Sequence, residues 1–308
     1  MFAFEGGYHG RTLGASSITS SYRYRRRYGH FGERAQFIPF PYHFRGPKGM
    51  TKEEYGSHCV QQFARLFETE YNGVWDPKVG QSEYAAFYVE PIQGTGGYVI
   101  PPMNFYRELK HVLDQHGILM IADEVQTGAG RTGTFFAMEQ MGVAPDLTTF
   151  AKSIAGGFPL AGVCGKAEYM DAIAPGGLGG TYAGSPIACA AALAVMEVFE
   201  EEKLLDRSKA VGERLTTGLR EIQKKYPIIG DVRGLGSMIA VEVFEKGTHT
   251  PNAAAVGQVV AKAREKGLIL LSCGTYYNVI RFLMPVTIPD AQLEKGIAIV
   301  AECFDELA

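Results

Sequence analysis

The sequence predicts an α/β fold in which a doubly wound, mainly parallel sheet is followed by a smaller α+β domain. From residue 2 to about residue 190, short apolar runs alternate with helical patterns, as in strands joined by crossover helices. One apolar run ends abruptly in Asp123, and a second ends shortly before Lys152. Ligands bind at the carboxyl ends of parallel strands, so these two residues mark a candidate site.

The elements of the first domain follow from these patterns in chain order. Residues 2–4 and 84–89 are short apolar runs and predict buried strands. Residues 104–115 carry apolar side chains at helical spacing, and residues 118–123 form the next strand. Residues 187–201 are rich in alanine and predict a long helix that begins just after a proline.

A charged stretch at residues 200–206 marks the expected change of domain. We therefore expect a large domain over residues 1–205 and a C-terminal small domain over residues 206–308. The small domain should contain helices and strands in mixed order. Its predicted helices are residues 207–225, 253–266 and 291–307, and its predicted strands are residues 238–243 and 268–271.

The composition is that of a globular protein without nucleic-acid, membrane or metal partners. Hydrophobic residues make up 46% of the 308 residues and charged residues 20%. A net charge of −3 gives no general attraction to nucleic acid or anionic lipid. No apolar run is long enough to span a bilayer, and the first five residues lack the pattern of a signal peptide; we expect a cytoplasmic protein from its cysteines. The five cysteines lack metal-ligand spacing and fit reduced thiols: Cys59, Cys164, Cys189, Cys273 and Cys303.

The pairing of Asp123 with Lys152 suits one cofactor especially well. Pyridoxal 5'-phosphate (PLP) uses a lysine for its Schiff base and a carboxylate that keeps its ring nitrogen protonated. Two buried, opposite charges on neighbouring strand ends therefore predict a PLP site. The alternatives are a solvated lysine beside a glycine turn and an aspartate that caps a helix or joins a core ion pair.

Six motifs occur in an order that resembles the class III aminotransferases of fold type I, and most closely the 4-aminobutyrate aminotransferases. The resemblance runs from Phe4 nearly to the C-terminus and implies the fold type I PLP-dependent transferase architecture, with the two domains given above. The motifs are Tyr8-His-Gly-Arg-Thr12, Glu90-Pro-Ile-Gln-Gly94, Ala122-Asp-Glu-Val-Gln-Thr-Gly128, Gly130-Arg-Thr-Gly133, Phe150-Ala-Lys-Ser-Ile-Ala-Gly-Gly157 and Gly179-Gly-Thr-Tyr-Ala-Gly184.

The resemblance implies which residues bind and activate the cofactor. Lys152 carries the Schiff base and then moves a proton between Cα of the substrate and C4′ of the cofactor. Asp123 pairs with the ring nitrogen, and Gln126 reaches the ring hydroxyl. Val125 packs against one face of the ring, and Tyr8 stacks on the other.

The resemblance also implies a substrate site and a shared dimer. Arg11 binds a substrate carboxylate, and Arg281 binds the α-carboxylate of glutamate or 2-oxoglutarate. Glu90 orders Gln126 and the substrate side of the pocket. Thr181 reaches across the interface to the PLP phosphate of a second subunit, so the expected assembly is a homodimer with shared active sites.

One position departs from the pattern of 4-aminobutyrate enzymes. Their loop carries a second glutamate, which pairs with the arginine matched by Arg281, whereas this chain has Thr95. A buried guanidinium without its carboxylate is costly. Water, another acid, or a donor that itself carries an α-carboxylate can take that place. The substitution leaves the identity of the amino donor open but does not affect transamination.

The predicted function is transfer of an amino group from 4-aminobutyrate or a similar amino acid to 2-oxoglutarate. An α-amino or ornithine-type donor is the close alternative. A PLP-dependent amino-acid racemase or epimerase would use the same Lys152 and Asp123 but protonate Cα on either face.

A third hypothesis is a non-catalytic remnant. Relatives carry an N-terminal segment whose small-residue turn binds the PLP phosphate, and no such turn precedes Tyr8. We therefore expect the chain to be N-terminally truncated.

Overall fold

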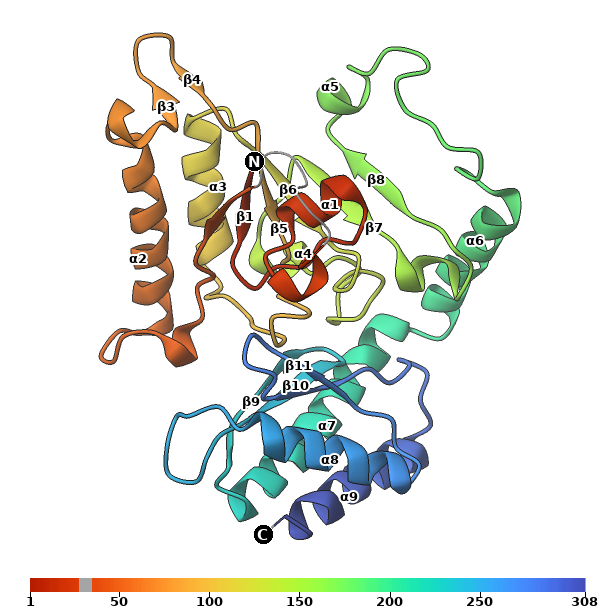
Figure 1. Cartoon of the computed structure of the whole chain (residues 1–308). Helices are drawn as coiled ribbons and strands as arrows, with labels where there is room; N and C mark the ends of the chain where they lie inside the picture. The colour runs from red at the N-terminus through yellow and green to blue at the C-terminus, as the bar shows by residue number, and fades with distance from the viewer. Residues whose placement is uncertain (28–34, 308) are drawn as a thin grey trace. The chain divides into compact units, whose positions relative to one another are not determined.

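The computed structural model describes residues 1–27 and 35–307 (Figure 1). The predicted domain ranges 1–205 and 206–308 also include residues 28–34 and 308, which lie outside the described residues. The chain divides into two compact units, and the predicted boundary at residue 205 stays a prediction. Unit 1 comprises Met1–Ile92, Pro101–Gly128 and Phe136–Met196, and unit 2 comprises Gln93–Ile100, Ala129–Phe135 and Glu197–Ala308.

Unit 1 is built on a sheet of six strands within the described residues, in the order β2-β1-β5-β6-β7-β8. Every pairing from β2 to β7 is parallel, and only β8 runs antiparallel to its neighbour. This arrangement confirms the predicted doubly wound, mainly parallel sheet. The strands are β1 (Phe2–Phe4), β2 (Gln36–Ile38), β5 (Ala86–Val89), β6 (Leu119–Asp123), β7 (Leu147–Phe150) and β8 (Gly162–Gly165).

Helices and a short hairpin complete unit 1. Helix α2 begins with a capping box in which Thr51 and Glu54 satisfy each other's backbone N–H groups. Helix α3 buries one face against β6, and Figure 1 shows it beside α2. The helices are α1 (Leu13–Ile18), α2 (Lys52–Ala64), α3 (Phe105–Gln115), α4 (Met138–Met141), α5 (Ala167–Met170) and α6 (Pro186–Glu201), which runs on into unit 2; the hairpin strands are β3 (Trp75–Asp76) and β4 (Gln81–Ser82).

Aromatic side chains pack the core around the first strand. Phe2 meets Phe63 edge to face with ring centroids 5.1 Å apart, and Phe4 meets Phe87 at 4.6 Å. Phe2 and Phe87 are fully buried, and each such side chain contributes about 1.5–3 kcal/mol through burial. This packing fixes β1 between β2 and β5, and so fixes the start of the loop that follows β1.

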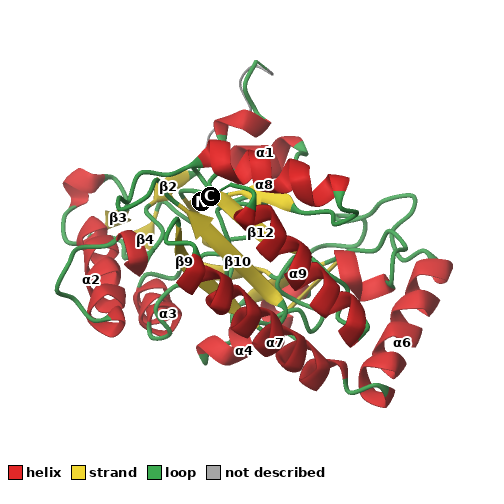
Figure 2. Cartoon of the chain, turned by 90° about the horizontal axis from the view of Figure 1, so that it is seen from below, coloured by secondary structure: helices red, strands yellow, loops and turns green. Residues whose placement is uncertain are grey.

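Unit 2 contains a four-stranded antiparallel sheet in its described residues, in the order β11-β12-β10-β9. Helices α7 and α9 lie side by side in Figure 2 and share one apolar core with the sheet. The elements are α7 (Leu204–Lys225), β9 (Ile229–Leu235), β10 (Met238–Val243), α8 (Ala253–Glu265), β11 (Leu271–Cys273), β12 (Val279–Phe282) and α9 (Asp290–Asp305).

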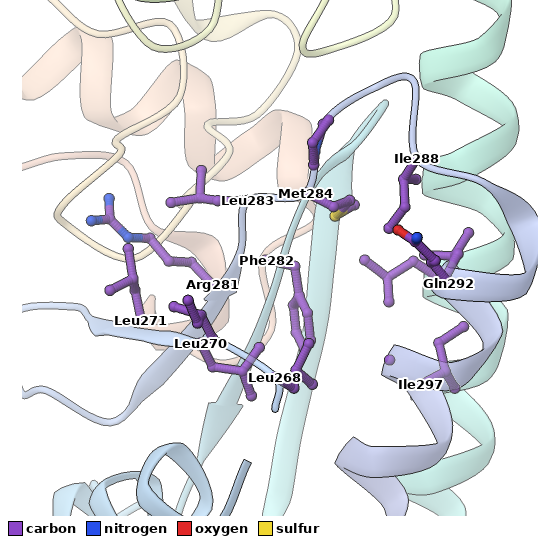
Figure 3. Close-up of a pocket in the computed structure, with 15 residues that line it drawn as sticks. Leu268, Leu270, Leu271, Arg281, Phe282, Leu283, Met284, Ile288, Gln292 and Ile297 are labelled. Atoms are coloured by element: carbon purple, nitrogen blue, oxygen red, sulfur yellow. The ribbon is translucent and has the colours of Figure 1, made fainter. Parts of the chain in front are cut away.

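One predicted element of unit 2 is displaced. The strand predicted over residues 268–271 is wrong in its bounds, because β11 begins at Leu271. Leu268 packs against the apolar core of unit 2 without pairing, and the ladder to β12 starts only where Leu271 meets Arg281. Burial of Leu268 and Leu270 (Figure 3) therefore accounts for part of the apolar run, whereas Ile269 is 85% exposed. None of the described helices has the length and apolar character needed to cross a bilayer.

Candidate functional site

Asp123 ends β6 as a buried carboxylate that the protein holds on both oxygens. Its Oδ2 lies 2.7 Å from Nδ1 of His9, and its Oδ1 accepts a hydrogen bond of 3.1 Å from the backbone N–H of Val125. An ionised carboxylate can only accept, so Nδ1 of His9 carries the proton and donates it. Each oxygen retains a second lone pair, which leaves the carboxylate able to accept from a ligand.

His9 is a site residue that the sequence analysis missed. Its side chain is only 2% exposed and packs edge-on against the ring of Tyr88 on β5, with ring centroids 5.0 Å apart. Its backbone N–H donates to Oγ1 of Thr19. Its position in the loop after β1 could have predicted the contact with Asp123. Strands β1 and β6 are both neighbours of β5, and the loops that follow them leave the same edge of the sheet.

Glu90 holds the same loop from the end of β5. Its Oε1 accepts a hydrogen bond of 2.8 Å from the backbone N–H of Tyr8, and its carbonyl accepts one from the buried Tyr106 hydroxyl. Gly7 is required here, because a Cβ at that position would lie 2.9 Å from the carbonyl oxygen of Phe4. The structure thus brings two predicted site residues, Tyr8 and Glu90, into direct contact.

Arg11 lies in an aromatic cluster beside this loop. Its guanidinium sits 4.6 Å above the ring of Tyr24, and Tyr8 meets the same ring edge-on at 4.9 Å. Arg11 itself is exposed. A cation held over an aromatic face keeps its outer N–H groups available for a carboxylate.

Two residues after Asp123 differ in their hydrogen bonding: Glu124 is fully bonded within the protein, and Gln126 has an oxygen left unpaired by the described part of the chain. Glu124 is 1% exposed, accepts from the backbone N–H of Met138 and from the Thr127 hydroxyl, and has its pKa raised by burial. It therefore holds the turn in place. Gln126 is half-buried, and its Oε1 is buried with no hydrogen-bond partner among the described residues. Such a buried acceptor is available to a donor from a ligand.

Lys152 lies two residues beyond β7, at the start of a single 3₁₀ turn, Lys152–Ala155. Because β7 pairs in parallel with β6, Lys152 and Asp123 leave the same edge of the sheet from neighbouring strands. Its φ of +51° is the left-handed conformation, which costs a non-glycine residue about 1–3 kcal/mol and concentrates at functional sites. The prediction that both charges are buried is wrong for Lys152, which this turn leaves exposed.

Thr181 and Arg281 are predicted site residues that do not follow the strand ends described above, and Val125 follows β6. Thr181 belongs to unit 1, in a stretch over residues 171–184 whose side chains are all exposed. Arg281 belongs to unit 2, on β12, where it pairs with Leu271 of β11 and Ala240 of β10. Val125 is half-buried in the turn that follows β6.

A mainly parallel sheet that presents a carboxylate and a lysine on adjacent strand ends defines the fold type I class of PLP-dependent transferases. Residues 1–304 match the family described as aminotransferase class III. The chain belongs to this family of enzymes.

Individual relatives are similar along the whole chain. The chain is 67% identical over 311 residues to 5-aminovalerate aminotransferase DavT of Pseudomonas putida, covering 100% of this chain and 69% of DavT. It is 52% identical over 308 residues to 4-aminobutyrate aminotransferase GabT of Escherichia coli, covering 99% of this chain and 68% of GabT. A solved amine transaminase from an uncultivated Pseudomonas species, in its PLP-bound form, superposes with a TM-score of 0.88 at 31% identity. The match covers 100% of this chain and 69% of that transaminase.

The cofactor of this family is PLP, and the residues present fit it. The Asp123 carboxylate retains lone pairs for a protonated ring nitrogen, and the orphaned Oε1 of Gln126 can accept from a ring hydroxyl. Lys152 follows the neighbouring strand at the same sheet edge and could supply an amine there. Among residues 1–27 and 35–307, no group of three or more His, Cys, Asp or Glu side chains is placed to hold a metal ion.

We expect the His9→Ala variant to bind PLP about tenfold more weakly or worse. The variant removes a hydrogen bond to a buried charge, and such bonds contribute about 1.5–3 kcal/mol. The measurement is a PLP titration followed by visible absorbance. His111→Ala, which removes an exposed histidine of α3, is the matched control. Equal affinity in His9→Ala and the wild type would contradict a role for His9.

Proposed function

We propose that this chain is a transaminase that moves the amino group of 4-aminobutyrate, 5-aminovalerate or a similar ω-amino acid to 2-oxoglutarate. The observation that carries the proposal is the placement of Asp123 and Lys152 on adjacent strand ends, in a chain 67% identical to a 5-aminovalerate aminotransferase. The 52% identity to a 4-aminobutyrate aminotransferase adds 4-aminobutyrate, which is one carbon shorter than 5-aminovalerate, to the proposed donors.

Bound PLP supplies the electron sink that stabilises negative charge at Cα of the substrate. The proposed role of Asp123 is to keep the ring nitrogen protonated, while His9 holds the carboxylate in place. The Lys152 amine moves a proton between Cα of the substrate and C4′ of the cofactor. Gln126 orients the ring through its hydroxyl, Val125 packs against one face and Tyr8 covers the other.

The proposed substrate contacts begin with Arg11, whose exposed guanidinium over Tyr24 can bind the carboxylate of an ω-amino acid. Arg11 lies in the loop after β1, and Glu90 positions that loop by accepting a hydrogen bond from the Tyr8 backbone N–H. Arg281 binds the α-carboxylate of 2-oxoglutarate in the second half-reaction.

The proposed assembly is a homodimer in which Thr181 of one subunit serves the PLP phosphate of the other. A contiguous stretch of exposed residues surrounds Thr181, including Leu178 at 74% and Tyr182 at 89% exposure. Ile187 and Leu193 on α6 are also more than half exposed. Exposed apolar side chains gathered in this way are typical of a surface that another subunit covers.

The proposed domain division remains a large domain over residues 1–205 and a small domain over residues 206–308. The proposed location is the cytoplasm. It is supported by the five cysteines, all of which are free thiols.

We expect the purified chain with PLP to show a visible absorbance band that Lys152→Ala abolishes, because Lys152 is the amine that the proposal assigns to the cofactor aldehyde. Adding 4-aminobutyrate or 5-aminovalerate should bleach the band, and adding 2-oxoglutarate should restore it with formation of glutamate. Lys48→Ala, at an exposed lysine of unit 1, should retain the band. A band that persists in Lys152→Ala would refute the lysine assignment, and bleaching without glutamate formation would refute the proposed acceptor.

We expect the chain to sediment as a dimer and the double variant Leu178→Arg/Ile187→Arg to sediment largely as a monomer. Two buried charges at an apolar interface are strongly unfavourable. Analytical ultracentrifugation at several concentrations measures the equilibrium, with Val79→Arg at another exposed apolar residue of unit 1 as the control. A wild-type chain that remains monomeric at every concentration would contradict the dimer.

A further inference from the structure

The ring of Tyr24 contacts two residues to which the proposed function gives a role. The guanidinium carbon of Arg11 lies 4.6 Å from the centroid of the Tyr24 ring. Tyr8 packs against the same ring in an edge-to-face arrangement, with the two centroids 4.9 Å apart. Tyr24 itself belongs to a 3₁₀ turn, Tyr22–Tyr24, and its side chain is half-buried. The proposed function does not yet give this residue a role.

Hydrogen bonds fasten the chain just before this turn to the loop after β1. The N–H of Ser20 donates to the Gly7 carbonyl at 3.0 Å, and the Ser20 hydroxyl accepts from the N–H of Gly6 at 3.0 Å. One residue earlier, the Thr19 hydroxyl accepts from the N–H of His9 at 3.0 Å. The 3₁₀ turn follows directly, so the aromatic ring is held to the loop that carries the proposed substrate contact.

An aromatic face can hold a guanidinium without neutralising it. Within residues 1–27 and 35–307, the Arg11 guanidinium forms no ion pair or hydrogen bond, and the Tyr24 ring is its partner. An acidic partner would cancel the positive charge and compete with a substrate carboxylate for the same N–H groups. The ring attracts the cation through its quadrupole and leaves those N–H groups unused. Tyr24 therefore orients Arg11 and preserves its charge.

The orientation matters because Arg11 is an exposed side chain. A free arginine samples many rotamers, and the freedom that it loses on binding weakens the complex. A guanidinium that is already stacked on a ring has lost part of this freedom before the ligand arrives. At exposed sites such stacking is favoured about two- to fivefold. The affinity for a carboxylate bound by Arg11 should rise by about the same factor.

A second guanidinium lies near the same ring at a greater distance. The guanidinium carbon of Arg23 is 5.9 Å from the centroid of Tyr24, close to the limit at which a cation is attracted by a ring. Arg23 is also the preceding residue in the chain, so its proximity follows from the sequence. The contact with Arg11 is shorter and joins separate segments, and it is the one that can fix a side chain of the substrate site.

We propose that Tyr24 is a positioning residue for the amino donor, whose ring holds the Arg11 guanidinium in the orientation that binds the donor carboxylate. The inference rests on the proposed function, in which Arg11 binds that carboxylate, and adds the residue that strengthens the contact. The ligand class is a carboxylate at the end of an unbranched carbon chain. The ring and not the hydroxyl has this role, so phenylalanine can replace Tyr24 and an aliphatic residue cannot.

The test measures binding of valerate, which is 5-aminovalerate without its amine, to the PLP-loaded chain by isothermal titration calorimetry. Tyr24→Leu removes the aromatic face and should raise the Kd for valerate about two- to fivefold. Tyr24→Phe keeps the face and should leave the Kd unchanged. Tyr71→Leu, at a tyrosine of unit 1 that is 94% exposed, is the matched control. The uncharged amide of valerate should bind the wild type and Tyr24→Leu equally.

A second background separates this role from a general structural one. Arg11→Met should weaken valerate binding, and adding Tyr24→Leu to it should change the Kd no further, because the ring acts through the guanidinium. If Tyr24 only supported the fold, Tyr24→Leu would weaken binding in both backgrounds, and the inference would be wrong.

The remaining outcomes distinguish this inference from the proposed function. A Kd in Tyr24→Leu equal to that of the wild type, together with weaker binding in Arg11→Met, would overturn the inference and leave the proposed Arg11 contact standing. Binding as weak in Tyr24→Phe as in Tyr24→Leu would overturn it as well, because the hydroxyl would then be responsible. Equal binding in Arg11→Met and the wild type would remove the Arg11 contact from the proposed function, and this inference with it.

Discussion

The site depends on the hydrogen bond between His9 and Asp123. A carboxylate at the end of a buried strand is costly unless it is paired, and this one is held by an imidazole at 2.7 Å and a backbone N–H at 3.1 Å. The same contact fastens the loop after β1 to the end of β6 across the intervening strand β5. Tyr8 and Arg11 belong to that loop, so the proposed cofactor contacts and the proposed substrate contact depend on the same hydrogen bond.

The parallel sheet makes this convergence possible. Strands β1, β5, β6 and β7 run in one direction, so the residues that follow them emerge at one edge. Glu90 leaves β5, Asp123 leaves β6 and Lys152 leaves β7, although long stretches of sequence separate them. The left-handed backbone of Lys152 is a local strain that this arrangement maintains, and the side chain is exposed at this edge.

The sequence predicted the sheet and the two charges because both follow from local patterns. Asp123 ends an unbroken apolar run, and β10 matches its predicted bounds because every one of its residues is buried. His9 was missed because its contact spans 114 residues and leaves no local pattern. The exposure of Lys152 and the late start of β11 were missed for a related reason, since burial and strand pairing both depend on which segments lie against a residue. The roles of Gln126, Thr181 and Arg281 rest on family resemblance and remain predictions.

The most direct test of the Asp123–His9 account is ¹⁵N NMR of PLP labelled at the ring nitrogen and bound to the chain. A carboxylate already held in place by His9 should keep that nitrogen protonated across the neutral pH range, and the chemical shift should not change between about pH 6 and 9. In Asp123→Asn the shift should move to that of an unprotonated ring. A wild-type shift that titrates with the pH of the solution, as the free cofactor does, would contradict the account.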